Sequence, residues 1–266
     1  MDNKDKLSGK VKILFQPAEE GVRGAAGMAA SGILDDCDYF LSSHVAMLAK
    51  SGELATNLYG FLCTTKYDVT FNGRASHAGV SPQEGRNALA AAANATVQML
   101  GISRHGGGMT RINIGQLVAG EGRNVIPSKA VMKLEVRGET MEINNYMSEQ
   151  VTNIVEGIAK GFSVTYDMRK MGEAVDLTAD QELIDILNES GREVGLKVLD
   201  KPLNFGGSED ATILARRVQA HGGKAAFFVW GSDRPSGHHS ALFDIQEKDM
   251  APAFDLWTHV LPKILK

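Results

Sequence analysis

Residues 11–21 read VKILFQPAEEG, and residues 38–44 read DYFLSSH. Each stretch is a short apolar run followed by ionisable side chains. Val, Ile, Leu and Phe favour a strand, and Pro17 has no N–H to continue a central ladder, so the first stretch predicts a strand over residues 11–15. The second predicts a short strand that leads to His44. Because ligands of open α/β sheets bind beyond the carboxyl ends of strands, Glu19, Glu20 and His44 are candidate site residues.

Two interpretations of these three side chains are open. Two Glu and one His at strand ends are typical of part of a metal site with a base beside it. Alternatively, Glu19 and Glu20 begin a helix, because its dipole favours carboxylates in the first turn, and His44 is an ordinary loop histidine.

The composition excludes several function classes. The 266 residues suffice for one large domain or two smaller ones, and 43% hydrophobic and 23% charged residues are ordinary for a globular protein. A net charge of −4 without a basic amphipathic helix predicts neither a nucleic-acid nor a membrane partner. Cys37 and Cys63 are the only cysteines, so the sequence indicates neither a disulfide framework nor a thiolate zinc site. We therefore expect a cytoplasmic protein.

The hydrophobic periodicity predicts an α/β chain interrupted by an α+β insert. Within the insert, the sequence predicts a strand, a helix, two strands, a helix and a strand, at residues 67–71, 87–100, 111–118, 130–136, 143–159 and 162–168. This order is that of a ferredoxin-like split βαβ unit. We place the insert at residues 66–176, between the two parts of an α/β domain at residues 1–65 and 177–266. After the insert we expect helices at 183–194, 211–219 and 248–265 and a buried strand at 225–230.

A third polar cluster, His238-His239, follows that buried strand. A catalytic zinc ion binds nitrogen and oxygen ligands and keeps a position open for water, whose proton a nearby carboxylate can take. Glu20, His44 and one of the two histidines could serve as ligands, with Glu19 as the base. The alternative for His238-His239 is a solvated loop.

Seven motifs of the chain occur in the order seen in the M20 metallopeptidases. They are QPAEEG at 16–21, SH at 43–44, GRASHAG at 73–79, RNVIP at 123–127, VR at 136–137, GSED at 207–210 and HS at 239–240. The chain most resembles the amidohydrolase branch of this family, which includes N-acyl-amino-acid amidohydrolases and aminobenzoyl-glutamate hydrolases. The resemblance covers nearly the whole chain.

The resemblance implies a fold, an activity and partners. The fold would be a zinc-peptidase-like α/β catalytic domain, truncated at its N-terminal part, with an inserted ferredoxin-like dimerisation (lid) domain. The activity would be metal-dependent hydrolysis of the amide bond of N-acyl or N-aroyl amino acids such as aminobenzoyl-glutamate, with zinc or manganese as the metal. The implied partners are a second copy of the chain, bound through the insert, and a companion hydrolase subunit.

The resemblance also implies roles for individual residues. Glu19 would be the general base, and Glu20, His44 and His239 metal ligands. His238 competes with His239, because the aromatic residue that follows the family's His-Ser stands one place later than usual, at Phe243. His77 would stabilise the oxyanion in the partner's active site, and Asn124 and Arg137 would hold polar groups of the substrate.

Each of these side chains has a structural alternative. His77 could belong to an exposed turn, Asn124 could tolerate a left-handed turn, and Arg137 could be a solvated charge at a sheet edge. For Glu209 and Asp210 we prefer the alternative, in which they cap the helix that follows Ser208.

The resemblance also predicts what the chain lacks. Family members carry an earlier segment with a Cys/His/Asp-type metal motif, and no Cys-x-His or His-x-Asp occurs in the 266 residues. We therefore expect an incomplete metal site. The alternative function is that of a catalytically incomplete fragment, which dimerises, binds a ligand or needs a separate chain for the remaining ligands.

Overall fold

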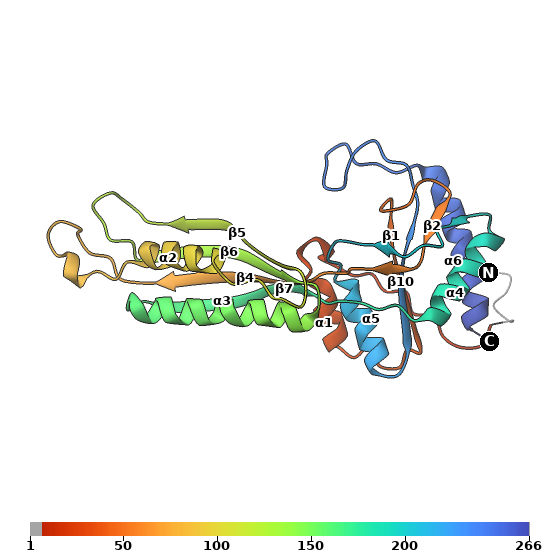
Figure 1. Cartoon of the computed structure of the whole chain (residues 1–266), viewed down its shortest axis with the longest axis horizontal. Helices are drawn as coiled ribbons and strands as arrows, with labels where there is room; N and C mark the ends of the chain where they lie inside the picture. Colours follow the sequence, from red (N-terminus) through yellow and green to blue (C-terminus); the bar gives the residue numbers. More distant parts are fainter. Residues whose placement is uncertain (1–6, 266) are drawn as a thin grey trace. The chain divides into compact units, whose positions relative to one another are not determined.

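The computed structural model describes residues 7–265, which form two compact units (Figure 1). The first unit contains residues 7–19, 24–61 and 177–265, and the second contains residues 20–23 and 62–176. The predicted boundaries, 65/66 and 176/177, did not anticipate that residues 20–23 lie with the second unit. Among residues 7–265, no helix has the length and apolar character that crossing a bilayer requires.

The first unit is built on a four-stranded sheet in the order β1-β10-β2-β8. Its strands are β1 (Tyr39–Val45), β2 (Glu53–Ala55), β8 (Lys197–Val198) and β10 (Lys224–Trp230). β1 runs parallel to β10, with His44 opposite Val229, whereas β10 and β2 are antiparallel. A separate parallel pair joins β3 (Leu58–Tyr59) to β9 (Leu203–Asn204).

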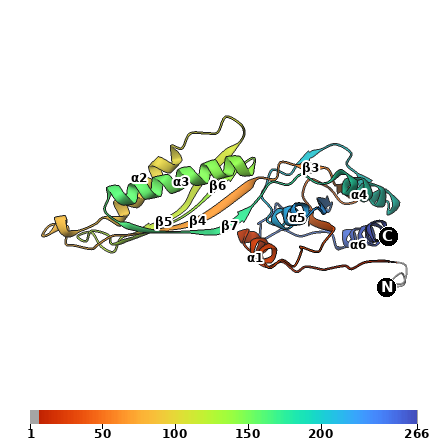
Figure 2. The same ribbon diagram turned by 90° about the horizontal axis from the view of Figure 1, so that it is seen from below.

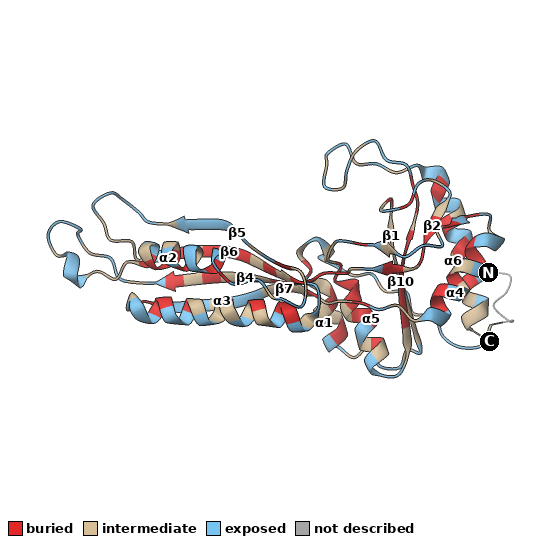
Figure 3. Cartoon of the chain, viewed as in Figure 1, coloured by how far each residue is buried: buried red, intermediate tan, exposed pale blue. Residues whose placement is uncertain are grey.

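Helices cover both faces of this sheet, because the interior strand β10 carries apolar residues on both sides (Figure 3). Phe227 packs in one cluster with Ala215 of α5 (Ala211–Ala220). Phe228 packs in another with residues of α4 (Gln181–Glu193) and α6 (Met250–Ile264), the latter preceded by the short 3₁₀ turn η4 (Glu247–Asp249). Helix α1 (Gly24–Ala30) packs its small residues Ala25 and Ala29 against α5.

The predicted strand at residues 11–15 is wrong. Within the part of the chain that the structure describes, this segment pairs with no strand, although its exposure alternates as in a strand. Leu14 packs against the α1–α5 cluster, whereas Ile13 and Phe15 are 76% and 89% exposed. A strand is held by its neighbours' hydrogen bonds, and an apolar run cannot supply these by itself.

The alternative in which Glu19 and Glu20 begin a helix is wrong, because the first helix begins only at Gly24. The intervening residues form a 3₁₀ turn, η2 (Glu19–Gly21), and Val22 has a left-handed φ of 50°. A single left-handed residue prevents the turn from continuing into an α-helix. The first helix therefore starts four residues beyond Glu20, the second of the two predicted site carboxylates.

The second unit is a four-stranded antiparallel sheet with helices on one face (Figure 2). Its elements follow the chain in the order β4 (Cys63–Asn72), η3 (Pro82–Glu84), α2 (Ala88–Leu100), β5 (Thr110–Ala119), β6 (Lys129–Gly138), α3 (Met141–Gly161) and β7 (Thr165–Ala174). The sheet order is β5-β6-β4-β7. Asn87 and Thr140 cap α2 and α3 by accepting from the N–H groups of Ala90 and Ile143.

Candidate functional site

His44 and His238 meet at the end of two adjacent parallel strands of the first unit. His44 is the penultimate residue of β1, and His238 lies in the loop that follows β10. Their ring centroids are 5.1 Å apart in an edge-on arrangement, and the His238 ring also packs on Phe243 at 4.6 Å. The structure therefore brings together two histidines that are 194 residues apart in the sequence.

Each of these two rings donates one N–H to a backbone carbonyl. His44 Nδ1 lies 2.8 Å from the oxygen of Val45, and His238 Nε2 lies 3.1 Å from the oxygen of Ala46. A carbonyl oxygen can only accept, so the lone pairs lie on Nε2 of His44 and Nδ1 of His238. Metal-binding histidines are held in this way, with the second ring N–H on a carbonyl or carboxylate.

Burial lowers the pKa of His238, and the nearby His44, Arg234 and His239 act in the same direction against the hydrogen bond to Ala46. A neutral imidazole can ligate a metal, so the depressed pKa favours this role. The two imidazoles fit a divalent ion such as zinc in donor type and in orientation of their hydrogen bonds.

His239, the ligand predicted first, is exposed and has a left-handed φ of 61°. The histidine that contacts His44 is its neighbour, His238. The assignment of His239 stays a prediction, with His238 as the competing residue that the geometry favours.

Glu19 lies in a cluster of three carboxylates. It begins the turn η2, directly after Ala18, whose φ is a left-handed 56°. Glu19, Glu209 and Asp210 each place one oxygen within 4.8 Å of the others, and the latter two are buried. Glu20 is exposed and lies with the second unit. Of the two predicted site carboxylates, Glu19 is therefore the one that lies close to other acids of the first unit.

The cap predicted for Asp210 is wrong. Asp210 stands at the N-terminus of α5, but its side chain makes no capping hydrogen bond there. Its carboxylate accepts instead from Gln16 Nε2 at 2.5 Å and from the N–H of Ala25 at 3.2 Å. Glu209 is the acid that contacts α5, through a bond from the N–H of Ala211 to its Oε1 at 3.2 Å.

Burial raises the pKa of Asp210, and its hydrogen bonds with Ala25 and Gln16 oppose the rise. Sequence reasoning missed this residue because its partners are 185 and 194 positions away. Because Asp210 directly precedes a helix, the sequence suggested a capping hydrogen bond to that helix. The available signal was that two adjacent acids follow a Gly-Gly loop, when one would suffice for a cap.

His77 and Asn124 lie side by side in the second unit. His77 forms an isolated antiparallel bridge with Val125, and the N–H of Ala78 donates to the oxygen of Asn124 at 2.9 Å. His77 Nδ1 accepts from the N–H groups of Gly79 and Val80 at 3.2 and 3.1 Å. In the neutral ring the proton therefore sits on Nε2, and the exposed side chain can present this N–H as a donor.

Arg137 lies on β6, an interior strand, so the alternative of a solvated charge at a sheet edge is wrong. Val136 is buried under the helices, and the pleat places Arg137 on the opposite face. Its Nε donates to Glu135 Oε1 at 3.0 Å, and its register partners are Arg111 and Thr64. Arg137 is thus half-buried on the uncovered face of the sheet.

The chain is similar to known proteins in both sequence and structure. The profile of "Peptidase family M20/M25/M40" matches residues 1–263. The chain belongs to this family. Among its curated M20 relatives, a homolog of a p-aminobenzoyl-glutamate hydrolase subunit from Haemophilus influenzae is 54% identical over 99% of this chain and 62% of that protein. "Indole-3-acetyl-aspartic acid hydrolase" of Enterobacter agglomerans is 41% identical over 94% of this chain and 58% of that protein.

A solved structure, that of an aminobenzoyl-glutamate utilization protein from Klebsiella pneumoniae, matches with a TM-score of 0.88. It is 38% identical and covers 98% of this chain, which spans 64% of that protein. The M20 chain thus spans about three fifths of the length of its curated relatives.

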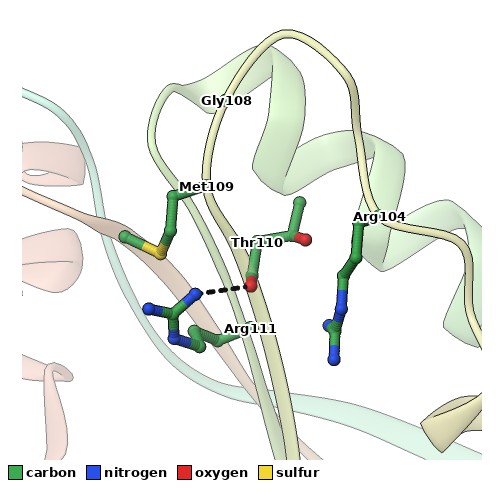
Figure 4. Close-up of a pocket in the computed structure, with 5 residues that line it drawn as sticks. All are labelled: Arg104, Gly108, Met109, Thr110 and Arg111. Carbon is green, nitrogen blue, oxygen red and sulfur yellow. Dashed lines mark hydrogen bonds between the residues drawn. The ribbon is translucent and has the colours of Figure 1, made fainter.

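Two concave regions lie in the second unit. One, of about 340 Å³, lies on the uncovered face of the sheet and includes Arg23, Lys66, Asn113 and Lys133. The other, of about 470 Å³, lies at the start of β5 (Figure 4). There Arg111 Nη1 donates to the oxygen of Thr110 at 3.0 Å. None of the predicted site residues of the M20 chain lines either region.

Proposed function

We propose that this chain carries part or all of the active site of an amidohydrolase that cleaves N-acyl or N-aroyl amino acids. The names of the Haemophilus and Enterobacter relatives each join an aromatic acyl group to an acidic amino acid, glutamate or aspartate. We extend this substrate class to the chain, with aminobenzoyl-glutamate as the first compound to test.

The observation that carries the proposal is the His44–His238 pair. Both rings donate one N–H to a carbonyl and keep one lone pair, which is what a divalent ion requires of its histidine ligands. We propose His44 and one of His238 and His239 as ligands, with Glu20 as a third, for zinc or manganese. When bound, such an ion polarises an amide carbonyl and makes water more acidic.

Glu19 has the chemistry of the general base in this proposal. A carboxylate can accept a proton from the attacking water and then deliver it to the amine nitrogen as the C–N bond breaks. One residue thus serves both proton transfers.

The second unit would supply substrate contacts. We propose that Nε2–H of His77 stabilises the oxyanion, as one preorganised donor can, and that Asn124 and Arg137 hold polar groups of the substrate. A guanidinium matches a carboxylate, which fits an acidic amino acid. The pairing of His77 with Val125 supports a joint role for His77 and Asn124.

We also propose that the second unit is an inserted ferredoxin-like domain through which the chain forms a homodimer. Its sheet order, β5-β6-β4-β7, and its order of helices and strands support the ferredoxin-like description. The exposed position of His77 is compatible with a role in a partner's site. A cytoplasmic location is supported by Cys37 and Cys63, which form no disulfide.

A second candidate function is that of a fragment that needs another polypeptide, such as a companion subunit, for the remaining metal ligands. Two observations favour it. The chain spans 62% of its Haemophilus relative, and the apolar residues Ile13 and Phe15 are exposed on an extended segment. Large exposed apolar side chains that lie close together are typical of a surface that another polypeptide covers.

Release of glutamate from aminobenzoyl-glutamate tests the proposal. The purified chain is incubated with the substrate and added zinc or manganese, alongside Glu19→Gln and the matched variant Glu149→Gln, which changes an exposed carboxylate on α3. We expect Glu19→Gln to lower the rate about 10²- to 10⁴-fold, the usual contribution of a general base. Equal rates for the two variants would contradict the role of Glu19. No release by the unaltered chain, but release after adding the part of a relative that the chain does not match, would favour the second candidate.

A further inference from the structure

Asp210 is a fully buried carboxylate that holds both ends of the segment carrying Glu19. We propose that Asp210 is a positioning residue, which fixes the loop of residues 16–25 and thereby the orientation of the Glu19 side chain. The inference rests on the proposed role of Glu19 as the base. Asp210 contacts Gln16 and Ala25, which are distant in the sequence, whereas a helix cap would bond only to nearby residues. The Gly-Ser-Glu-Asp motif thus has a role besides starting α5.

The contacts join the two ends of the loop. On one side, Gln16 Nε2 donates to Asp210 Oδ1 at 2.5 Å. On the other side, the N–H of Ala25 donates to Oδ2 at 3.2 Å, and the N–H of Gly24 also donates to this carboxylate. Glu19 lies between these two ends in the sequence, and one of its oxygens is within 4.8 Å of an oxygen of Asp210. A single side chain thus binds the loop before and after the proposed base.

The conformation of the loop needs such support. Ala18, which directly precedes Glu19, has a φ of 56°, a region that residues with a Cβ rarely adopt. The loop also closes tightly, since a Cβ at Gly24 would lie 1.7 Å from the oxygen of Pro17. Backbone in such conformations persists only where surrounding contacts determine it. The hydrogen bonds that Asp210 accepts from Gln16, Gly24 and Ala25 tie the loop to the residue directly before α5.

The backbone at Asp210 is itself held in place by packing and hydrogen bonds. It directly precedes α5, whose Ala211, Leu214 and Val218 are buried. Thr212 Oγ1 donates to the oxygen of Glu209 at 2.6 Å, which holds the turn before the helix. The loop is therefore fixed to the packed core of the first unit.

The Gln16–Asp210 contact can be broken and restored by exchanging charge. Gln16→Glu places two carboxylates at hydrogen-bond distance and removes the donor. Adding Asp210→Asn restores the contact, because the Asn amide can donate to Glu at position 16 while its oxygen accepts from Ala25. Gln219→Glu is the matched control, since Gln219 Nε2 donates to Asp180 Oδ2 at 2.8 Å in the same unit. Gln219→Glu places a second carboxylate beside Asp180, and so creates the same repulsion at a site outside the loop.

Amide hydrogen exchange of Gly24 and Ala25, measured on the purified chain at pH 7.5, provides a readout independent of activity. We expect Gln16→Glu to speed exchange of both amides at least tenfold, and the double variant to restore it. In hydrolysis assays, kcat should fall at least tenfold with KM within twofold, and the double variant should recover kcat.

Exchange in Gln16→Glu that matches the Gln219→Glu control would overturn the proposal. Faster exchange with unchanged kcat would also overturn it, because Asp210 would then hold the loop without orienting the base. No hydrolysis in any variant, with or without the added part of a relative, would refute the proposed function. The exchange rates and their recovery would then still decide whether Asp210 fixes the loop.

Discussion

The ring of His238 stands edge-on against that of His44, with centroids 5.1 Å apart, and both rings donate to consecutive carbonyls of one turn. These carbonyls belong to Val45 and Ala46, and Ala46 has a left-handed φ of 58°. A tight turn at the end of β1 thus sets the tautomer of two side chains from opposite ends of the sequence. Imidazoles that are preorganised in this way are suited to binding a divalent ion.

Replacement of His44 by Asn should weaken zinc binding by at least tenfold, because even the loss of an outer hydrogen-bond partner costs about 10- to 100-fold in metal affinity. Between His238→Asn and His239→Asn, we expect the larger loss for His238→Asn, given its contact with His44. Calorimetric titration of the purified chain with zinc measures all three affinities. A larger loss for His239→Asn would show that the neighbouring histidine is the ligand.

Replacement of His77 by Gln should lower kcat about 10²- to 10³-fold with little change in KM, the usual effect of removing one oxyanion donor. His105→Gln is the matched control, because His105 Nδ1 accepts from the N–H of Gly107 as His77 Nδ1 does from Gly79. Steady-state hydrolysis of aminobenzoyl-glutamate distinguishes them. Similar kinetics for both variants would leave His77 a turn residue and nothing more.

Phe228→Ala should destabilise the first unit by about 3–5 kcal/mol, the range for truncating a buried aromatic side chain. Phe228 is 0% exposed and lies 5.4 Å from the ring of Trp257. The control Phe254→Ala removes a ring that is 69% exposed and should change stability by less than about 0.5 kcal/mol. Trp230 and Trp257 are the only tryptophans and both lie in the first unit, so their fluorescence in a urea titration follows that unit.

Arg217→Ala should raise the pKa of Asp35. Arg217 Nε donates to Asp35 Oδ1 at 2.7 Å, and Nη2 donates to Oδ2 at 2.6 Å. These hydrogen bonds are the main cause of the lowered pKa of Asp35. Because the pKa is lower in the folded state, the stabilisation is present above the unfolded value of about 4 and is lost as the pH falls through the folded value. Carboxyl NMR titration of the two proteins measures the change. An Asp35 pKa that does not move would contradict the assignment.

Local patterns in the sequence predicted most of the elements. The strand at 111–118 is β5, the helix at 143–159 is α3, and the buried strand at 225–230 is β10. The apolar residues of α3 and β10 face cores, as do Ile112 and Ile114 of β5, so periodicity and packing agree there. Leu117 and Val118 of β5 are exposed. The strand prediction at residues 11–15 failed because an apolar run forms a strand only where neighbouring strands supply its hydrogen bonds.

The sequence by itself determined the chemical inventory of this M20 chain: acids after an apolar run, histidines after two others, and a histidine between small residues. Tertiary structure alone decided which of them meet. It placed His238 beside His44, turned Asp210 away from its own helix toward Gln16, and set Arg137 on an interior strand. The physical reason is that propensity and periodicity act over a few residues, whereas these contacts depend on strand register and loop conformation across nearly 200 residues.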